Sequence, residues 1–213
     1  MKKYKLYLFD LDGTLLDSDP MIIETFKDLY KKYKPKDFEP SIERMLSFSG
    51  PPIRETLKQE FPELDQEPLL LEWRDKSVAN YPKYTKLYPG ALELLKHLKD
   101  KGIHVAIVTN KHRAATDSVF KLFGFDKLDI YSICGDEVKQ QKPNPDGVYK
   151  CMSYFGIQDK KDVIYIGDSK YDLLTSKNAG VDFGFVTWSP RKFEKNTENT
   201  VEIDNYSDFA RAI

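Results

Sequence analysis

The chain is poor in cysteine, in excess charge and in long apolar runs. Of its 213 residues only Cys134 and Cys151 are cysteines, and they form no CxxC pair, so we expect buried apolar side chains in a reducing, cytoplasmic compartment. The 33 basic residues nearly balance the 34 acidic ones, so the protein has no excess of positive charge that would attract nucleic acid. No stretch approaches the ~20 apolar residues of a membrane span, and the run at residues 6–9 is too short for a signal peptide. We therefore expect neither nucleic acid nor membrane as a partner.

The apolar residues that are present gather in short runs. Hydrophobic residues make up 40% of the chain and charged residues 31%, which suits a buried core with a solvated surface. The runs are continuous rather than alternating, which favours parallel strands covered by helices on both faces. We expect these strands at residues 6–9, 105–108, 130–134, 163–166 and 183–187.

Glycines end the helical stretches between these runs. Each glycine is followed by an apolar residue that can fold back on the helix, the Schellman arrangement, before the next strand begins. The four positions are Gly102, Gly124, Gly156 and Gly180. Repeated strand and helix units of this kind predict an α/β fold with a Rossmann-like parallel sheet.

Residues 17–87 break this rhythm. They contain no strand and helix unit that ends at a glycine, and their apolar residues recur at helical spacing. After a first helix that begins near Asp19, further helices are expected at residues 42–48, 53–61 and 67–81. We therefore predict a catalytic α/β core of residues 1–16 and 88–213 with an inserted helical cap of residues 17–87.

Two acids follow the first predicted strand. Asp10 and Asp12 stand in the sequence FDLDGT at residues 9–14. In open α/β sheets the carboxyl ends of the strands are where ligands bind, so this position favours a functional site over a plain polar turn. A calcium loop is disfavoured, because Gly13 stands at the fourth rather than the sixth position of the pattern.

Further polar residues follow the later strands. Thr109 and Asn110 follow the second strand, Lys142 precedes a proline, and Asp168 and Asp172 follow a later strand. Taken singly, each could be a helix cap or a solvated side chain. Taken together, their order on successive strands favours a single site.

These four motifs occur in an order that resembles a known superfamily. DLDGT at residues 10–14, TN at 109–110, KP at 142–143 and GDSKYD at 167–172 resemble the motifs of the haloacid dehalogenase (HAD) superfamily, in its phosphatase branch with a helical cap. The resemblance covers essentially the whole chain and is most like phosphoglycolate phosphatases and their pyrophosphatase relatives. It implies a HAD-like fold and a monomer or homodimer that hydrolyses a small phosphorylated metabolite.

The resemblance also implies a role for each polar residue. Asp10 is the expected nucleophile, which forms an aspartyl-phosphate, and Asp12 protonates the leaving oxygen and later activates water. Lys142 pairs with Asp10 and a phosphate oxygen as a point charge. Mg²⁺, which prefers oxygen ligands, is expected on Asp10, the Asp12 carbonyl and Asp168, with Asp172 orienting a water or Lys142 behind them. The alternative is that Asp172 binds the metal directly. The expected donors to the remaining phosphate oxygens are Thr109 and Asn110.

The same residues disfavour three other functions. Dehalogenases lack the second acid of the first motif, whereas Asp12 is present. The β-phosphoglucomutase group commonly carries Glu-Asp-Ser at the fourth motif, whereas this chain has Gly167 before Asp168, which disfavours a phosphomutase. A non-catalytic phosphate-binding or interaction protein could keep the same fold. The presence of every charged residue of the four motifs argues against this function.

One arginine of the predicted cap is the candidate for substrate specificity. The sequence GPPIR at residues 50–54 resembles the family's specificity loop. A guanidinium can bind a carboxylate or a second phosphate through two parallel hydrogen bonds. We therefore expect Arg54 to bind the distal group of the substrate, and the alternative is an ion pair on the surface.

Overall fold

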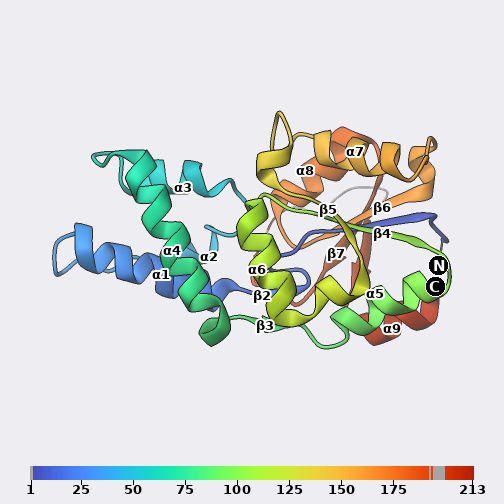
Figure 1. Ribbon diagram of the computed structural model, residues 1–213, viewed down its shortest axis with the longest axis horizontal. Helices are drawn as coiled ribbons and strands as arrows, with labels where there is room; N and C mark the ends of the chain where they lie inside the picture. The colour runs from blue at the N-terminus through green and yellow to red at the C-terminus, as the bar shows by residue number, and fades with distance from the viewer. Residues whose placement is uncertain (1, 192, 194–199) are drawn as a thin grey trace.

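The computed structural model describes residues 2–191, 193 and 200–213, which form a parallel sheet between layers of helices and a separate group of helices beside it (Figure 1). In the described residues the large sheet has the order β5, β4, β1, β6, β7, β8, and every neighbouring pair is parallel. Its strands are β1 (Leu6–Phe9), β4 (His104–Val108), β5 (Tyr131–Ile133), β6 (Val163–Gly167), β7 (Asp182–Val186) and β8 (Thr200–Ile203). The predicted α/β class and five predicted strands are confirmed, and β8 is an addition.

Alternation along β1 separates the two faces of the sheet. Tyr7 and Phe9 belong to one buried cluster with residues of the helices at 91–100 and 206–212, whereas Leu6 and Leu8 belong to another with residues of the helices at 146–154 and 170–179. Because both faces are covered, the central strand is apolar throughout, as its sequence indicated. The helices around the sheet are α5 (Ala91–Asp100), α6 (Arg113–Phe123), α7 (Asp146–Tyr154), α8 (Lys170–Ala179) and α9 (Tyr206–Ala212).

The turns after these helices follow the predicted pattern. The four glycines expected to end helices all adopt positive φ, between +68° and +83°. In this left-handed region a Cβ atom would be strained, which explains glycine there. Short 3₁₀ turns occupy Phe125–Leu128, Gly135–Glu137 and Lys160–Asp162.

The helical group is built around Phe26. Its ring centroid lies 4.4 Å from that of Phe48 and 4.5 Å from that of Trp73, so the aromatic side chains hold together helices from different parts of the segment. The helices are α1 (Asp19–Tyr33), α2 (Ile42–Leu46), α3 (Ile53–Glu60) and α4 (Gln66–Tyr84), close to the predicted ranges. None of the described helices has the length and apolar character needed to cross a membrane.

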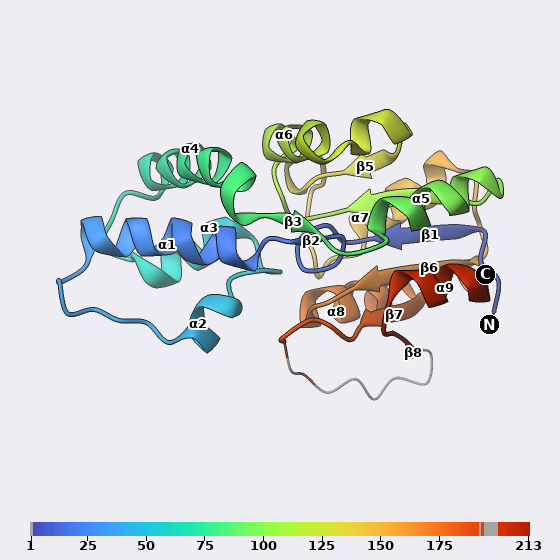
Figure 2. The same ribbon diagram turned by 90° about the horizontal axis from the view of Figure 1, so that it is seen from below.

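A two-stranded antiparallel ribbon joins the helical group to the sheet. In β2 (Leu16–Asp17) and β3 (Lys86–Leu87), Leu16 pairs with Leu87 and Asp17 with Lys86. The helical group therefore leaves the sheet after β1 and returns beside its point of departure, and both chain ends lie at the opposite side of the molecule (Figure 2). The predicted boundaries at residues 17 and 87 fall on this ribbon, and the division into two domains stays a prediction.

Candidate active site

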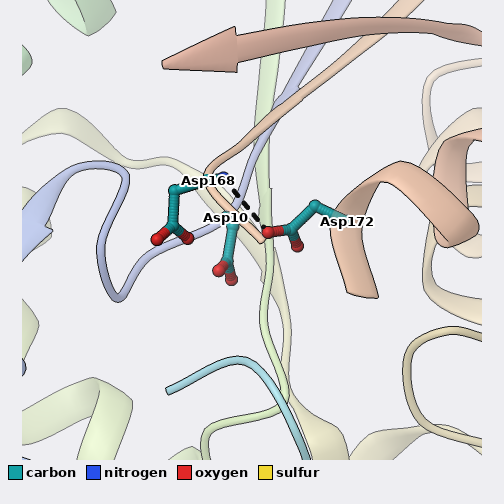
Figure 3. A group of neighbouring side chains, drawn as sticks. All are labelled: Asp10, Asp168 and Asp172. Atoms are coloured by element: carbon teal, nitrogen blue, oxygen red, sulfur yellow. Dashed lines mark hydrogen bonds between the residues drawn. The ribbon is translucent and has the colours of Figure 1, made fainter. Parts of the chain in front are cut away.

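The predicted acids gather at the carboxyl edge of the sheet. Asp10 follows β1, Asp168 follows β6, which pairs with β1, and Asp172 lies in the first turn of α8. One carboxylate oxygen from each lies within 4.8 Å of the others, and all three residues are buried (Figure 3). The pairing of β1 with β6 therefore joins acids from opposite ends of the sequence.

Gly13 allows the chain to turn beside these acids. Its φ is +79°, and a Cβ atom there would lie 2.2 Å from Oδ2 of Asp168. Only a residue without a side chain fits both the backbone conformation and the close contact. The glycine of the first motif is thus required for the loops after β1 and β6 to approach one another.

Lys142 is a buried cation between two of the acids. Its Nζ lies 2.7 Å from Oδ1 of Asp10 and 2.7 Å from Oδ1 of Asp172, and its side chain is 3% exposed. The ammonium group offsets the repulsion between carboxylates that have lost most of their water. The structure therefore brings Lys142 and Asp10 together, and the role of the lysine in the reaction stays a prediction.

Both oxygens of Asp172 already accept hydrogen bonds. Oδ2 accepts from the backbone N–H of Asp168 and from the N–H and hydroxyl of Ser169, whereas Oδ1 accepts from Lys142 and Tyr165. Ser169 and Asp172 also form the capping box that starts α8. Because its oxygens are engaged, Asp172 is suited to orient Lys142 rather than to bind a ligand directly.

Asp168 has one engaged oxygen and one without a partner. Oδ2 accepts from the Ser189 hydroxyl at 3.1 Å and from Arg191, whose guanidinium also binds Asp19 at the start of α1. Oδ1 is buried and has no hydrogen-bond partner among the residues described. Sequence reasoning missed Arg191, because it stands in a loop beyond the last motif and carries no pattern.

Asp12 is held by another cation that sequence reasoning missed. Nζ of Lys111 lies 2.9 Å from Oδ2 of Asp12 and donates to the hydroxyl of Tyr81 on α4, at 2.7 Å. Oδ1 of Asp12 is buried without a hydrogen-bond partner in the described part of the chain. The signal for Lys111 was its position directly after Asn110 in the second motif.

Thr109 and Asn110 lie beside the acids at the end of β4, but the Asn110 side chain is already engaged. Its amide donates to the carbonyls of Gly50 and Lys142, and its oxygen accepts from the N–H of Lys142. Thr109 is buried and lines a cavity next to Asp10. The Asn110 amide must leave Gly50 before it can bind a phosphate, and the phosphate-binding role of both residues stays a prediction.

Burial changes the proton affinity of the two central acids. It raises the pKa of Asp10 to about 8, against the opposing charge of Lys142 and with the support of Asp172 and Asp168. It raises the pKa of Asp168 to about 7, against the opposing charge of Arg191. A further positive charge at these oxygens would favour their ionised forms.

The residues present fit a divalent cation. The buried acids supply oxygen donors, and Oδ1 of Asp168 and Oδ1 of Asp12 lack hydrogen-bond partners among the described residues. Hard cations such as Mg²⁺ and Ca²⁺ take oxygen ligands of this kind. Asp10 and Asp168 are the side chains suited to hold the ion, because the oxygens of Asp172 are occupied, and the Asp12 carbonyl stays a predicted ligand.

A cavity of about 90 Å³ lies between these residues and the helical group, several times the space that one water molecule needs. Asp10, Asp12 and Lys142 line it from the sheet side, and Trp73 and Arg74 line it from α4. Its other lining residues are Met21, Ile22, Phe48, Ser49, Gly50, Pro51, Ile53, Ser77, Tyr81, Thr109, Asn110, Lys111, His112 and Ala115.

The structure does not bring Arg54 into this cavity. Arg54 is exposed and forms an ion pair with Glu67 near the start of α4. Although the GPPIR loop reaches the cavity through Gly50, Pro51 and Ile53, the first turn of α3 directs the arginine to its outer surface. The expectation that Arg54 binds the distal group of the substrate stays a prediction that this placement does not favour, and Arg74 is the cap arginine that lines the cavity.

Comparison with known proteins shows the family to which this chain belongs. A sequence model of the haloacid dehalogenase-like hydrolases matches residues 7–186, which include all four motifs. The chain belongs to the haloacid dehalogenase-like hydrolase family. This confirms the resemblance found in the sequence motifs and the HAD-like fold.

Similar proteins within the family place the chain in its phosphatase branch. It is 34% identical to the pyrophosphatase PpaX of Halalkalibacterium halodurans over 184 residues, 86% of this chain and 84% of that protein. The structure of a candidate phosphoglycolate phosphatase from Lactobacillus plantarum superposes with a TM-score of 0.86 at 21% identity, over the whole of both chains. That of a candidate β-phosphoglucomutase from Thermotoga maritima gives 0.77 at 21% identity, over 98% and 97%. The predicted phosphatase-type enzyme is confirmed.

The raised pKa values predict how stability depends on pH in chelator. Burial raises the folded-state pKa of Asp10 to about 8 and that of Asp168 to about 7, from the ordinary value of 3.8. Their contribution to stability is therefore full at low pH and is lost as pH rises through the folded pKa values. We expect the urea unfolding free energy to fall between about pH 5 and 8, and to fall less in Asp168→Asn. Equal slopes for the two proteins would contradict the effect of burial on Asp168.

Proposed function

We propose that this HAD phosphatase hydrolyses a small phosphate monoester, or pyrophosphate, through a covalent intermediate on Asp10. The observation that carries the proposal is a buried carboxylate that lines a small cavity and lies 2.7 Å from the ammonium group of Lys142. An ionised carboxylate is the nucleophile of this chemistry, and a fixed cation beside it neutralises the charge that approaches with the phosphate.

In the first half-reaction, an oxygen of Asp10 forms a bond to phosphorus and the bond from phosphorus to the leaving oxygen breaks. Asp12 gives its proton to that oxygen, so that the leaving group departs as an alcohol or as phosphate. Lys142, fixed by Asp172, holds the attacking carboxylate and a phosphate oxygen in place. The products of this step are the aspartyl-phosphate and ionised Asp12.

In the second half-reaction, water attacks the phosphorus of the aspartyl-phosphate. Asp12 accepts the proton of the water, the bond between phosphorus and Asp10 breaks, and inorganic phosphate leaves. A Mg²⁺ ion held by Asp10, Asp168 and the Asp12 carbonyl would supply positive charge that neutralises the phosphate oxygens. Residues 17–87 act in this proposal as a cap, which excludes water from the cavity in one half-reaction and admits it in the other.

The substrate class is supported by the cavity and by the relatives. The cavity of about 90 Å³ suits a small phosphorylated metabolite rather than a polymer, and PpaX of Halalkalibacterium halodurans is named a pyrophosphatase. A phosphomutase is disfavoured because Gly167 stands where the mutase group commonly has a glutamate. A purely non-catalytic protein is disfavoured because Asp10, Asp12, Lys142 and Asp168 meet at one edge of the sheet.

The first test concerns the metal. In chelator, after verified removal of metal, we expect no turnover of p-nitrophenyl phosphate, and Mg²⁺ should restore it while Zn²⁺ restores little, because all the donors are oxygen. Mg²⁺ should also raise the melting temperature of the wild type and not of Asp168→Asn. Full turnover in chelator would overturn the metal requirement.

The second test concerns the nucleophile. Asp10→Asn keeps the size of the side chain, but an amide does not attack phosphorus, so we expect kcat to fall by at least about 10³-fold. No phosphorylated protein should be recovered by acid quench and mass spectrometry, and circular dichroism should be that of the wild type. Near-normal single-turnover rates in this variant would assign the attack to another group.

The third test concerns the acid. Asp12→Asn should slow hydrolysis of alkyl phosphates by about 10²- to 10⁴-fold, because an alkoxide leaves poorly without a proton. The loss in the phosphoryl-transfer step should be much smaller with p-nitrophenyl phosphate, whose leaving oxygen needs little protonation. Equal losses for both substrates, measured before the steady state, would exclude the acid role.

A further inference from the structure

Within the part of the chain that the structure describes, the charged side chains that line the cavity are paired, with one exception. Lys142 pairs with Asp10, Lys111 pairs with Asp12, and His112 faces Asp136 outside the lining. The exception is a cation on α4.

Arg74 is that cation. Within the described residues it forms no ion pair, although it is half-buried and lines the cavity. Glu67, two turns earlier on α4, is exposed and pairs with Arg54 instead. The charge of Arg74 helps to lower the pKa of Glu67, but the two form no ion pair, so within the described residues the cap side of the cavity carries a guanidinium without a direct ionic partner.

The lining atoms that lack a hydrogen-bond partner also differ between the sheet side and the cap side of the cavity. At the sheet side, Oδ1 of Asp12 is a buried acceptor without a hydrogen-bond partner in the described chain. At the cap side, Nε of Arg74 and Oγ of Ser49 are buried and likewise lack partners among the described residues. An N–H can only donate and a hydroxyl can donate, so the cap side offers donors to an acceptor that enters the cavity.

Other polar groups of the cap lining are already engaged. The hydroxyl of Ser77 donates to the carbonyl of Trp73, and the hydroxyl of Tyr81 accepts from Lys111. Among the buried side-chain atoms described, Nε of Arg74 and Oγ of Ser49 are the donors of the cap lining that lack a partner. Apolar side chains surround them, including Ile22, Phe48, Ile53 and Trp73. A guanidinium in such surroundings binds an anion more strongly than one in water does.

We propose that Arg74, assisted by Ser49, binds a second anionic group of the substrate, the one that is not transferred. This inference rests on the proposed function, since the first anionic group is the phosphate that reacts with Asp10. The partner of Arg74 is a carboxylate or a second phosphate, both of which accept two parallel hydrogen bonds from a guanidinium. Specificity then depends on α4 and not on Arg54 in the GPPIR loop.

The experiment compares kcat/KM for three substrates in four variants. 2-Phosphoglycolate carries a distal carboxylate, pyrophosphate carries a second phosphate, and p-nitrophenyl phosphate carries no second anion. Arg74→Ala should lose at least about 30-fold on the better of the first two and less than about threefold on p-nitrophenyl phosphate. Arg74→Lys should recover only part of this loss, and Ser49→Ala should lose less than Arg74→Ala. Whichever of 2-phosphoglycolate and pyrophosphate depends more on Arg74 identifies the distal group.

Arg54→Ala is the matched comparison, because it removes the same side chain from the same part of the protein outside the cavity. We expect its three kcat/KM values to stay within about twofold of the wild type. A selective loss in Arg54→Ala with none in Arg74→Ala would overturn the proposal, as would equal losses on all three substrates in Arg74→Ala.

A binding measurement separates this inference from the proposed function. In the Asp10→Asn background, calorimetry should detect the binding of 2-phosphoglycolate or pyrophosphate. Arg74→Ala should weaken that binding at least about 30-fold, while the unfolding free energy in urea stays unchanged. If the wild type hydrolyses none of the three substrates, the proposed function fails. If it hydrolyses them and Arg74→Ala binds 2-phosphoglycolate and pyrophosphate as tightly as its parent does, only the inference about Arg74 fails.

Discussion

A buried ammonium group between two buried carboxylates is the interaction on which the site depends. Lys142 lies 2.7 Å from both Asp10 and Asp172, and Asp168 lies within the same cluster. Three carboxylates at this separation would repel one another strongly with little water between them. Removal of the lysine would leave Asp10 and Asp172 without their buried cationic partner, which is far more costly than loss of an exposed ion pair.

The backbone around the cluster is adapted to this crowding. A Cβ atom on Gly167 would lie 2.4 Å from Cβ of Asp172, and one on Gly13 would meet Asp168. Both glycines therefore stand where acids approach the backbone. The sheet places the strand ends at one edge, and the glycines allow the acids to close around the lysine.

Charged contacts also connect the sheet edge with the helical group. Lys111 joins Asp12 to Tyr81 on α4, and Arg191 joins Asp168 to Asp19 on α1. Residues at the carboxyl edge of the sheet are thus held by contacts with the helical group. If the cap moves during turnover, these contacts must break and re-form, so its position and the orientation of Asp12 change together.

The sequence predicted the elements whose signals are local or periodic. Continuous apolar runs and glycine stops located five strands, and the order of motifs located Asp10, Lys142 and Asp168, because the carboxyl ends of parallel strands share an edge. Arg191 could not be found, since its contacts depend on the path of a loop without a motif. Arg54 was chosen from its loop, but the direction of an arginine on a helix depends on packing, and only the structure separates it from Arg74.

The attack of Asp10 on phosphorus is tested most directly by the stereochemical course of the reaction. Each in-line displacement inverts the configuration at phosphorus, so transfer to Asp10 and then to water gives net retention. A phosphate ester that is chiral through oxygen isotopes and sulfur, hydrolysed in isotopically labelled water, should therefore yield thiophosphate of retained configuration. Inversion would mean a single direct attack by water and would exclude an aspartyl-phosphate on Asp10.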